Sequence, residues 1–475
     1  MKICLILEGS YPYVRGGVSS WAHDLIKTLS QHEFVLWTIG ALRENRGKFL
    51  YELPQNVVEV REVFLDEALD LRLSNKGNLS FTAWETEEIQ KMIKGEDPDW
   101  DVLFHCYNKR GINPIAFLKS EHFLNLLKEM CREHYPYAAF SDLFYTVRSI
   151  ILPLIYLMGE DVPQADIYHA AATGYSGILG AMGTWKYKKP FIVTEHGIYT
   201  REREEEILRS KWITPYFKDM WIAFFYMLSR CAYGRADIVT SLFERAKNMQ
   251  IELGCSPQKC RVINNAVYYE NYSGIPIKQK DAYIDIGAIV RIAPIKDIKT
   301  MIYSFTELKH TVPNARLHIL GGVDDKEYDR ECHDLVDQLG VQDILFVGNT
   351  DVQEYMKKLD FTILTSISEA QPLAVIESMA AGRACIVTDV GACREMVEGG
   401  GEDVFGQSGI CIPPMHKIAL TNAMMRLSLN EDLRARMGEV GKKRAKQYFN
   451  HEKMIQSYQD TYERVIEQWQ VSDLN

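Results

Sequence analysis

Short, uninterrupted apolar runs that alternate with helical periods constrain the fold of this chain more than any other feature of its sequence. Residues 3–7 are apolar at every position, which is typical of a parallel strand buried on both faces. Apolar residues then recur at helical spacing between Val18 and Leu29, and residues 34–39 are predicted to form a second strand. This order of strand, loop, helix and strand predicts an α/β fold with parallel sheets.

The same alternation starts a second time in the C-terminal half of the chain. Its predicted strands are residues 284–289, 316–320, 344–347, 361–364 and 384–388. A chain of 475 residues exceeds what one hydrophobic core usually supports, so two domains of roughly 200 residues each are expected.

The polar, aperiodic segment 268–282 is predicted to link these two domains. We therefore expect two doubly wound, Rossmann-like domains, over residues 1–272 and 283–451. Residues 51–160 show mostly helical periods between polar loops and are expected to form an elaboration of the first domain.

Composition and charge narrow the functional classes. The chain has 54 basic and 64 acidic residues and a net charge of −10, so no extended basic face is expected for binding nucleic acid. Its ten cysteines show no C-x-x-C pair and no zinc spacing, which indicates reduced thiols in a cytosol.

Membrane insertion and secretion are not expected. The first residues run into a strand-like segment that is too short for a signal peptide. The longest apolar runs, 150–158 and 220–228, are shorter than the ~20 residues that span a bilayer. We expect a soluble, cytoplasmic protein without direct membrane insertion.

Two carboxylates follow the predicted strand 361–364. Glu369 lies in the loop where that strand would end, and Glu377 lies in the next helix, whose first turn can accommodate Pro372. Glu377 interrupts the helix face that should pack on the sheet, where an unpaired carboxylate would be costly. A ligand hydroxyl would explain this position, and so would a salt bridge combined with a helix-start acid at Glu369.

A cationic pair occupies the loop after the first strand of the second series. Arg291 and Lys296 are five residues apart, which lets both side chains hold one diphosphate, although two solvated charges would show the same spacing. Gly16-Gly17 and Gly321-Gly322 let a ligand approach the backbone, or form simple turns. The G-x-G-x-x-G fingerprint of nicotinamide cofactors is missing after the first strand.

Polar side chains also gather at predicted strand ends in the first domain. His169 ends one strand, and Glu195, His196 and Arg201 follow the strand over residues 191–194. Because ligands of open α/β sheets bind beyond the carboxyl ends of strands, this position favours a functional role for His196. His169 taken alone is more typical of a structural histidine.

One further segment, 97–101, formally matches the D-x-D pattern that holds a divalent metal with a nucleotide diphosphate. No strand leads into it, and Pro98 indicates an exposed turn, so no metal site is predicted.

Taken together, these motifs follow the order found in the family-4 retaining glycosyltransferases of the GT-B fold, which the chain resembles over nearly its whole length. They are Gly16-Gly17, Thr194-Glu195-His196-Gly197, Asn264-Asn265-Ala266-Val267, Arg291 with Lys296, Gly321-Gly322, Glu369-x7-Glu377 and Asp389-x-Gly391. The segments 7–21 and 194–203 further resemble the PelF glycosyltransferases of Pel exopolysaccharide synthesis.

The resemblance implies two Rossmann-like domains that face each other across a cleft, with a helix over residues 452–475 that completes the first, acceptor-binding domain. Arg291 and Lys296 would hold the donor diphosphate in place of a metal. Glu377 would bind the ribose, Glu369 the donor sugar, and His196 the sugar near the reacting carbon. The implied catalytic residues are His196, Arg291, Lys296 and Glu369, and the implied substrate-binding residues are Gly16, Gly17, His169, Glu195, Arg201, Asn265, Gly321, Gln371, Pro372, Leu373 and Glu377.

One loop departs from the family pattern. Where members often carry Glu-Gly-Phe-Gly-Leu, this chain has Glu369-Ala370-Gln371-Pro372-Leu373. Pro372 removes a backbone N–H that could bind sugar or phosphate, and Gln371 adds a polar side chain. The identity of the donor sugar is therefore left open.

The function implied by the resemblance is a metal-independent, retaining transfer of a hexose from a UDP-hexose to a growing, Pel-type exopolysaccharide in the cytoplasm. No cofactor beyond the donor is expected, and the resemblance implies an export complex at the inner membrane as partner. A GT-B sugar-nucleotide epimerase and a non-catalytic nucleotide-sugar-binding subunit are the alternatives.

Overall fold

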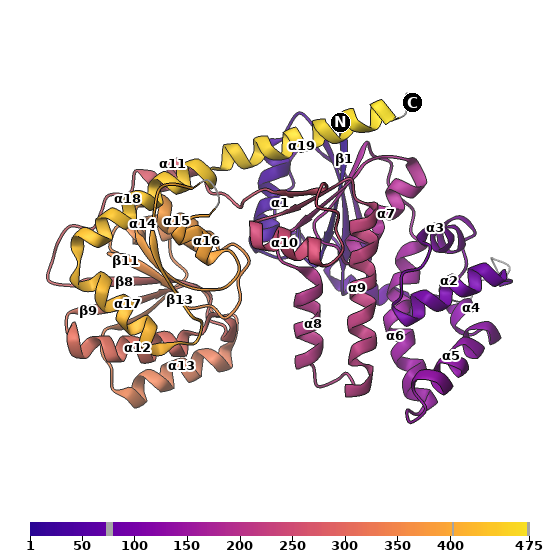
Figure 1. Ribbon diagram of the computed structural model, residues 1–475, viewed down its shortest axis with the longest axis horizontal. Coiled ribbons are helices and arrows are strands. Elements are labelled where there is room, and N and C mark those ends of the chain that lie inside the picture. The colour runs from indigo at the N-terminus through magenta and orange to yellow at the C-terminus, as the bar shows by residue number, and fades with distance from the viewer. Residues whose placement is uncertain (73–78, 401–402, 473–475) are drawn as a thin grey trace. The chain divides into compact units, whose positions relative to one another are not determined.

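A computed structural model of the chain describes residues 1–72, 79–400 and 403–472. Contacts divide the chain into two compact units, each built on one parallel sheet surrounded by helices (Figure 1). The N-terminal unit comprises Met1–Ser241, Lys247–Arg261 and Tyr458–Asn475, and the C-terminal unit comprises Leu242–Ala246 and Val262–Ser457. The predicted boundary at residue 272 therefore falls inside the C-terminal unit.

The sheet of the N-terminal unit has seven strands in the order β3-β2-β1-β4-β5-β6-β7. Strand β1 (Lys2–Glu8) lies at its centre, in parallel with β2 (Glu33–Gly40) and β4 (Ile167–Ala170). Side chains from Ile3 to Leu7 are buried, which confirms that this apolar run is an interior strand. The other strands are β3 (Val57–Phe64), β5 (Phe191–Glu195), β6 (Ile238–Ser241) and β7 (Cys260–Val262).

Strand β3 lies in the segment predicted to be mostly helical, and in this respect the prediction is wrong. The strand forms an edge of the sheet, and most of its side chains are at least partly exposed. It therefore lacks the uninterrupted apolar run by which interior parallel strands are recognised. Helices do follow it, namely α2 (Ala83–Lys94), α3 (Trp100–Phe104), α4 (Pro114–Leu118), α5 (Glu121–His134) and α6 (Phe140–Met158).

Helix α6 includes the predicted apolar run 150–158 and continues through Pro153. Within the described residues it is the one helix long and apolar enough to cross a membrane, judged by length and composition only. The expectation that every apolar segment is too short is wrong for this helix. Its buried side chains belong to the hydrophobic core of the N-terminal unit, where it packs against α5 and α7 (Tyr175–Tyr187).

The sheet of the C-terminal unit has six strands in the order β10-β9-β8-β11-β12-β13. All five predicted strands of the second series are present, and a sixth strand is added at the edge. The strands are β8 (Ile284–Ile289), β9 (Ala315–Leu320), β10 (Ile344–Gly348), β11 (Phe361–Leu364), β12 (Ala384–Thr388) and β13 (Gly409–Ile412). The surrounding helices include α12 (Ile298–Thr311), α13 (Lys326–Leu339), α14 (Val352–Met356), α15 (Leu373–Ala380), α17 (Lys417–Leu429) and α18 (Glu431–Tyr448).

Two helices change the expected chain organisation. Helix α11 (Tyr269–Ser273) forms inside the segment predicted to be an aperiodic linker, and it packs against α15 and α18. Helix α19 (His451–Ser472) belongs to the N-terminal unit from Tyr458 onward. The side chains of Tyr458 and Tyr462 are buried in that unit.

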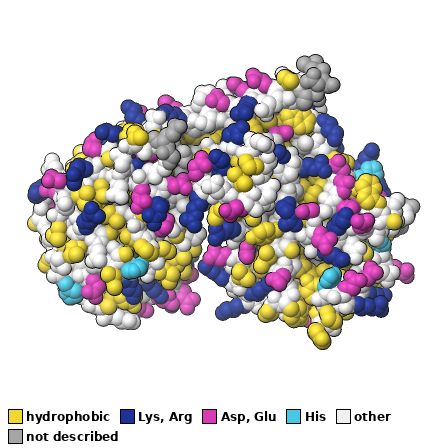
Figure 2. Space-filling view, in the orientation of Figure 1, with side chains coloured by type: hydrophobic (Ala, Val, Ile, Leu, Met, Phe, Trp, Pro, Cys, Tyr) yellow, Lys and Arg dark blue, Asp and Glu magenta, His cyan; other side chains and the backbone are white. Residues whose placement is uncertain are grey.

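Basic and acidic side chains are interspersed over the visible face of the molecule (Figure 2). This mixture agrees with the near balance of the two charge types in the sequence.

Candidate functional site

The C-terminal sheet has a switch point between β8 and β11. From β8 the chain continues to β9 and β10 on one side, and it then returns to β11 on the other side. The loops that follow β8 and β11 therefore emerge side by side at the carboxyl ends of their strands, where open α/β sheets bind ligands. These loops carry Lys296 and Glu369.

Hydrogen bonds hold the two loops against each other. The hydroxyl of Thr365 donates to the carbonyl oxygen of Lys296 at 2.8 Å, and the N–H of Ile367 donates to that of Ile295 at 2.8 Å. From the neighbouring strand β12, the hydroxyl of Thr388 donates to the carbonyl oxygen of Ser366 at 2.6 Å. The backbone that presents the functional side chains is thus fixed from three strands.

Lys296 and Glu369 form an ion pair at this edge of the sheet. The Ser366 hydroxyl donates a second hydrogen bond to the same carboxylate oxygen of Glu369, at 2.6 Å. The side chains of Lys296 and Glu369 are only 16% and 12% exposed, so their charges are partly desolvated. A partly desolvated ammonium beside a carboxylate can bind an anion and a hydroxyl group next to each other.

The Glu369 loop rests on Gly391, whose φ is +52°. A Cβ at this position would overlap the carbonyl oxygens of Glu369 and Ala370, and the N–H of Ala392 donates to Ala370 at 2.7 Å. The glycine of the Asp389-x-Gly391 motif is thus required by the close approach of two backbone segments.

Gln371 and Asn265 bind each other, although both were expected to bind substrate. The N–H of Asn265 donates to the side-chain oxygen of Gln371 at 2.6 Å, and its side-chain amide donates to the Gln371 carbonyl at 3.1 Å. The Gln371 amide donates in turn to the side chain of Asn264 at 3.0 Å. The buried Gln371 side chain therefore anchors the loop, whereas the sequence interpretation assigned this residue to substrate binding.

Glu377 lies within α15, where burial raises the pKa of its carboxyl group and a hydrogen bond from the Tyr272 hydroxyl acts in the opposite direction. Tyr272 comes from α11, in the segment predicted to be a linker. Pro372 is the N-cap residue of α15 and Leu373 is its first residue. No side chain caps the N–H groups of this helix start, in the part of the chain that is described.

Arg291 has a different carboxylate partner from Lys296. Its guanidinium pairs with Asp324 at 2.5 Å, and its side chain is 66% exposed. The two cations of the predicted clamp therefore engage different carboxylates in this structure.

Gly321 has a φ of +148°, and a Cβ there would overlap the carbonyl oxygen of Val290. The glycine is explained by strand packing between β8 and β9, where the sequence indicated space for a ligand.

In the N-terminal unit the switch point lies between β1 and β4. Gly16 and Gly17 start helix α1 (Gly17–Thr28) and are exposed, with no atom near the place of a Cβ. Their backbone is therefore open to a ligand. Arg201, on helix α8 (Tyr199–Arg209), is also exposed, and its guanidinium contacts the sulfur of Met249 at 3.7 Å.

His169 is a core residue, which corrects its prediction as a substrate-binding group. Its Nδ1 is 2.7 Å from the Tyr462 hydroxyl and its Nε2 is 2.8 Å from the Thr194 hydroxyl, so both ring nitrogens have protein partners. Burial, followed by the neighbouring His196, lowers its pKa to about 3. A neutral ring without free polar atoms is available for packing but not for substrate.

Glu195 is likewise committed to the core. Its carboxylate accepts hydrogen bonds from the hydroxyls of Tyr233 (2.6 Å) and Thr173 (3.1 Å), the amide of Gln250 (2.9 Å) and the N–H of Tyr199 (3.2 Å). Burial raises the pKa of this carboxyl group despite these hydrogen bonds. The side chain of Glu195 is therefore buried in the core of the N-terminal unit.

His196 keeps an uncommitted polar atom. Its ring packs against Trp21 with centroids 4.6 Å apart, and its buried Nε2 has no hydrogen-bond partner among the described residues. Burial lowers its pKa to about 4, so the ring is neutral at pH 7. A neutral imidazole can donate or accept one further hydrogen bond.

The sequence interpretation missed Glu8, the last residue of β1. Its carboxylate accepts from the Tyr199 hydroxyl at 2.9 Å and from the N–H of Ser176 at 3.3 Å, and Arg203 lies 3.9 Å away. Burial raises the pKa of Glu8. The available signal was an acid placed directly at the carboxyl end of the first strand.

The formal D-x-D segment has protein partners throughout. Asp97 pairs with Arg230 at 2.6 Å and Asp101 with Arg235 at 2.7 Å, both from helix α9 (Lys218–Arg235). Asp99 caps the start of α3.

Two family models match the chain in succession. The model described as "Domain of unknown function (DUF3492)" matches residues 1–258, and the model described as "Glycosyl transferases group 1" matches residues 276–444. The two matches correspond to the N-terminal and C-terminal series of strands.

Curated relatives match more distantly. The chain is 22% identical to the MMP alpha-(1->4)-mannosyltransferase of Mycolicibacterium hassiacum over 58% of this chain and 66% of that protein. It is 27% identical to the N-acetyl-alpha-D-glucosaminyl L-malate synthase of Bacillus anthracis over 36% of this chain and 43% of that protein. The chain thus spans less than two thirds of the length of either relative.

Solved structures match over almost the full length. Anabaena HepE in complex with UDP has a TM-score of 0.61 at 14% identity, covering 98% of this chain and 100% of that chain. Sucrose-phosphate synthase from Thermosynechococcus elongatus has a TM-score of 0.60 at 16% identity, covering 98% and 99%. These likenesses, with the two parallel sheets, establish the GT-B fold.

Proposed function

The chain belongs to the group 1 glycosyltransferases, with a DUF3492 domain as its N-terminal part, and we propose that it transfers a hexose from a UDP-hexose to a growing exopolysaccharide. The observation that carries this proposal is the Lys296–Glu369 pair at the switch point of the C-terminal sheet. There a cation and a carboxylate lie side by side, as a donor with a diphosphate next to a sugar requires.

A uridine nucleotide is supported by the solved likenesses, since HepE has been crystallised with UDP and with UDP-glucose. In the proposed complex, Lys296 binds the diphosphate and Glu369 accepts hydrogen bonds from hydroxyls of the hexose. Glu377, whose own partner is the Tyr272 hydroxyl, binds the ribose. Arg291 is exposed and supplies the second cation when a diphosphate competes with Asp324.

Transfer is proposed to retain the anomeric configuration. The bond between the anomeric carbon and the β-phosphate oxygen breaks, and the acceptor oxygen bonds to the same face of that carbon. The departing phosphate takes the proton of the acceptor hydroxyl, which gives UDP. The ammonium of Lys296 stabilises the negative charge that develops on the diphosphate, a task that a metal performs in D-x-D enzymes.

The N-terminal unit is proposed to bind the acceptor. Among its uncommitted polar groups are His196 and the exposed Gly16-Gly17 backbone. The resemblance of segments 7–21 and 194–203 to PelF supports a Pel-type polysaccharide as product. It also supports a cytoplasmic enzyme that an export complex recruits to the inner membrane.

Substitution Lys296→Gln tests the diphosphate role. We expect the Kd for UDP, measured by calorimetry, to rise about 10- to 100-fold, because a charged hydrogen bond of about 1.5–3 kcal/mol is lost. The matched control is Lys443→Gln, an exposed lysine of α18, which should bind UDP as the wild type does. Wild-type UDP affinity in Lys296→Gln would show that the diphosphate binds elsewhere.

A product test separates transfer from the alternatives. Incubation of the full chain with UDP-glucose and a polysaccharide acceptor should release UDP and extend the acceptor. An isomerised UDP-sugar would indicate an epimerase, and binding without turnover would indicate a nucleotide-sugar-binding subunit.

A further inference from the structure

A polar cavity lies at the amino-terminal end of the C-terminal sheet, opposite the edge that carries Lys296 and Glu369. Its volume is about 560 Å³, within the ~300–1,000 Å³ of typical small-molecule sites. Among the residues that line it are Asp285, near the start of β8, Arg316, near the start of β9, and His318, farther along β9. Lys296 and Glu369 follow the opposite, carboxyl ends of the strands, so a strand length of roughly 20 Å separates the two places. We call this hollow the amino-edge cavity.

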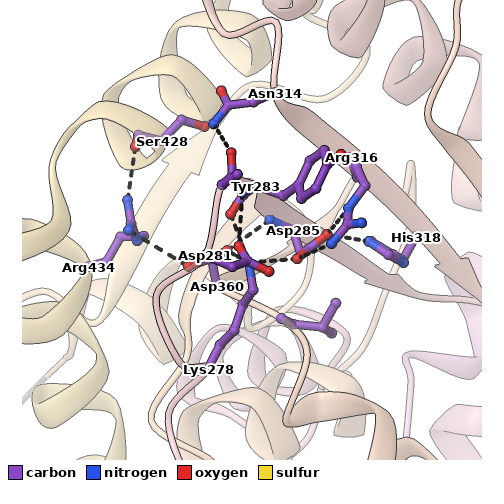
Figure 3. Close-up of polar contacts among 12 residues, drawn as sticks. Lys278, Asp281, Tyr283, Asp285, Asn314, Arg316, His318, Asp360, Ser428 and Arg434 are labelled. Carbon is purple, nitrogen blue, oxygen red and sulfur yellow. Dashed lines mark hydrogen bonds and ion pairs between the residues drawn. The ribbon is translucent and has the colours of Figure 1, made fainter.

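The buried carboxylate of Asp285 organises the polar wall of the cavity (Figure 3). It accepts two hydrogen bonds from Arg316, at 2.6 and 2.9 Å, and one from Nε2 of His318 at 2.8 Å. Lys278 lies 2.6 Å from its second oxygen. Burial alone would raise the pKa of Asp285, but these hydrogen bonds lower it below its ordinary value. The carboxylate is therefore ionised and fixes the orientation of three nitrogen-bearing side chains.

A buried arginine holds the opposite wall in place. The guanidinium of Arg383 donates to the carbonyl oxygens of Pro276 (2.7 Å), Met356 (2.8 Å) and Leu359 (2.9 Å). Pro276 lines the cavity, and Met356 and Leu359 flank the lining residues Lys357 and Lys358. The cavity therefore has fixed walls on both sides, as a preformed ligand site requires.

Positive charge in the cavity exceeds what the wall carboxylates use. Arg316 binds Asp285 through Nε and Nη2, and within the described residues its Nη1 has no recorded partner. Lys358 is exposed and contacts the ring of Tyr355 at 4.7 Å, and none of the described carboxylates pairs with it. Lys357 shares its charge with Glu354, which is exposed. A bound phosphate would receive donors from all three cations.

The remaining lining groups suit a polyhydroxylated molecule. Gln279 and Asp281 both line the cavity and are exposed, and Asp281 pairs with Lys278. Outside the lining, the ring of Tyr283 lies under the guanidinium of the lining residue Arg316, whose Cζ is 4.0 Å from the ring centroid. Amides and carboxylates bind sugar hydroxyls, and aromatic faces pack against sugar rings.

We propose that the amino-edge cavity binds the phosphate monoester of a sugar, with the phosphate at Arg316, Lys357 and Lys358 and the sugar hydroxyls toward Gln279 and Asp281. This site is separate from the donor site and lies wholly within the C-terminal unit. The ligand is a second, non-reacting molecule, since neither wall carries the Lys296–Glu369 pair.

Calorimetry on the full chain tests this assignment with glucose 6-phosphate, glucose 1-phosphate, inorganic phosphate and neutral glucose as probes. We expect one sugar phosphate to bind with 1:1 stoichiometry, inorganic phosphate to bind at least tenfold more weakly, and glucose not to bind. The double variant Lys357→Gln/Lys358→Gln should weaken the sugar phosphate at least tenfold. Both lysines are exposed, so the variant should keep the wild-type melting temperature.

Two control variants locate the binding. Lys443→Gln and Lys296→Gln should both bind the sugar phosphate with wild-type affinity, because neither residue lines the cavity. Unchanged binding in the double variant, or loss of binding in Lys296→Gln, would overturn the proposal. Absence of binding by every phosphate up to millimolar concentration would also overturn it. Equal affinity for inorganic phosphate and for the sugar phosphates would overturn the part of the proposal that assigns contacts to the sugar. UDP affinity, measured in parallel, reports on the donor site and stays informative whichever result is obtained.

Discussion

The ion pair between Lys296 and Glu369 gives the two residues opposite effects on donor binding. With no donor bound, the carboxylate neutralises the ammonium and competes with any anion for it. With a donor bound, the carboxylate is free to accept hydrogen bonds from the sugar. Glu369 should therefore weaken the binding of UDP, which lacks a sugar, and strengthen the binding of a UDP-hexose.

Substitution Glu369→Gln separates these two effects. We expect the affinity for UDP to stay equal or to increase, while kcat/KM for transfer from UDP-glucose falls about 10- to 100-fold, as loss of a charged hydrogen bond predicts. Calorimetry with UDP and initial rates of transfer provide the two measurements.

The matched control is Glu331→Gln, which removes the carboxylate of the exposed Lys299–Glu331 pair in the same unit. It should change neither quantity. A parallel loss of UDP affinity and of turnover in Glu369→Gln would mean that the carboxylate holds the loop together and does not contact the sugar.

Among the elements, the loop between β11 and α15 is the one in which this chain departs from its family pattern. Gln371 exchanges three hydrogen bonds with Asn264 and Asn265, which lie more than 100 positions earlier in the chain. Two involve its side-chain amide and one its backbone carbonyl. In this chain a glutamine side chain therefore anchors a loop that carries glycines in the family pattern. The proline after it is the N-cap residue of α15.

Substitution Gln371→Ala should therefore destabilise the C-terminal unit. The N–H of Asn265 and the side chain of Asn264 would lose their partner, which costs about 1–3 kcal/mol of unfolding free energy. Urea denaturation followed by circular dichroism measures this cost. Gln338→Ala, at an exposed position of α13, is the control and should stay within ±0.5 kcal/mol of the wild type. Equal stability of the two variants would contradict an anchoring role.

Strands were predictable from the sequence where burial on both faces requires a nearly uninterrupted run of apolar residues. Interior strands such as β1 and β8 are mostly apolar, with the buried Asp285 of β8 as an exception, and the loops after them carry the motifs. The edge strand β3 was not predicted because its partly exposed side chains leave no such run. The partners of His169 and Gln371 could not be predicted either, because Tyr462 lies 293 residues from His169 and no local pattern encodes a contact at that separation. Motif position therefore indicated the right edge of each sheet but not which polar groups remain free there.

At the scale of the whole chain, the last helix packs into the core of the N-terminal unit. Tyr462 of α19 binds His169 at the end of β4, and Tyr458 packs against Trp21 of α1 with ring centroids 5.5 Å apart. Residues far apart in the sequence thus share one core, and helix α19 contributes to the packing of the N-terminal unit. The neutral imidazole of His169 is the polar centre of this contact.

This arrangement predicts a pH dependence of stability that belongs to His169. Its pKa is about 3 in the folded protein and about 6.5 when unfolded, so below pH 6.5 the unfolded state binds a proton that the folded state does not. The stabilisation is complete above pH 6.5 and is lost as the pH falls toward 3, by about 1.4 kcal/mol per pH unit. Relative to His169→Gln, the wild type should therefore lose about 2–3 kcal/mol of unfolding free energy between pH 6.5 and 4.5, measured by urea denaturation. Tyr462→Phe keeps the ring buried but removes one partner of His169, so it should lower stability at every pH and preserve this slope. If the stability of the wild type instead changed with pH as that of His169→Gln does, the buried histidine would already be protonated.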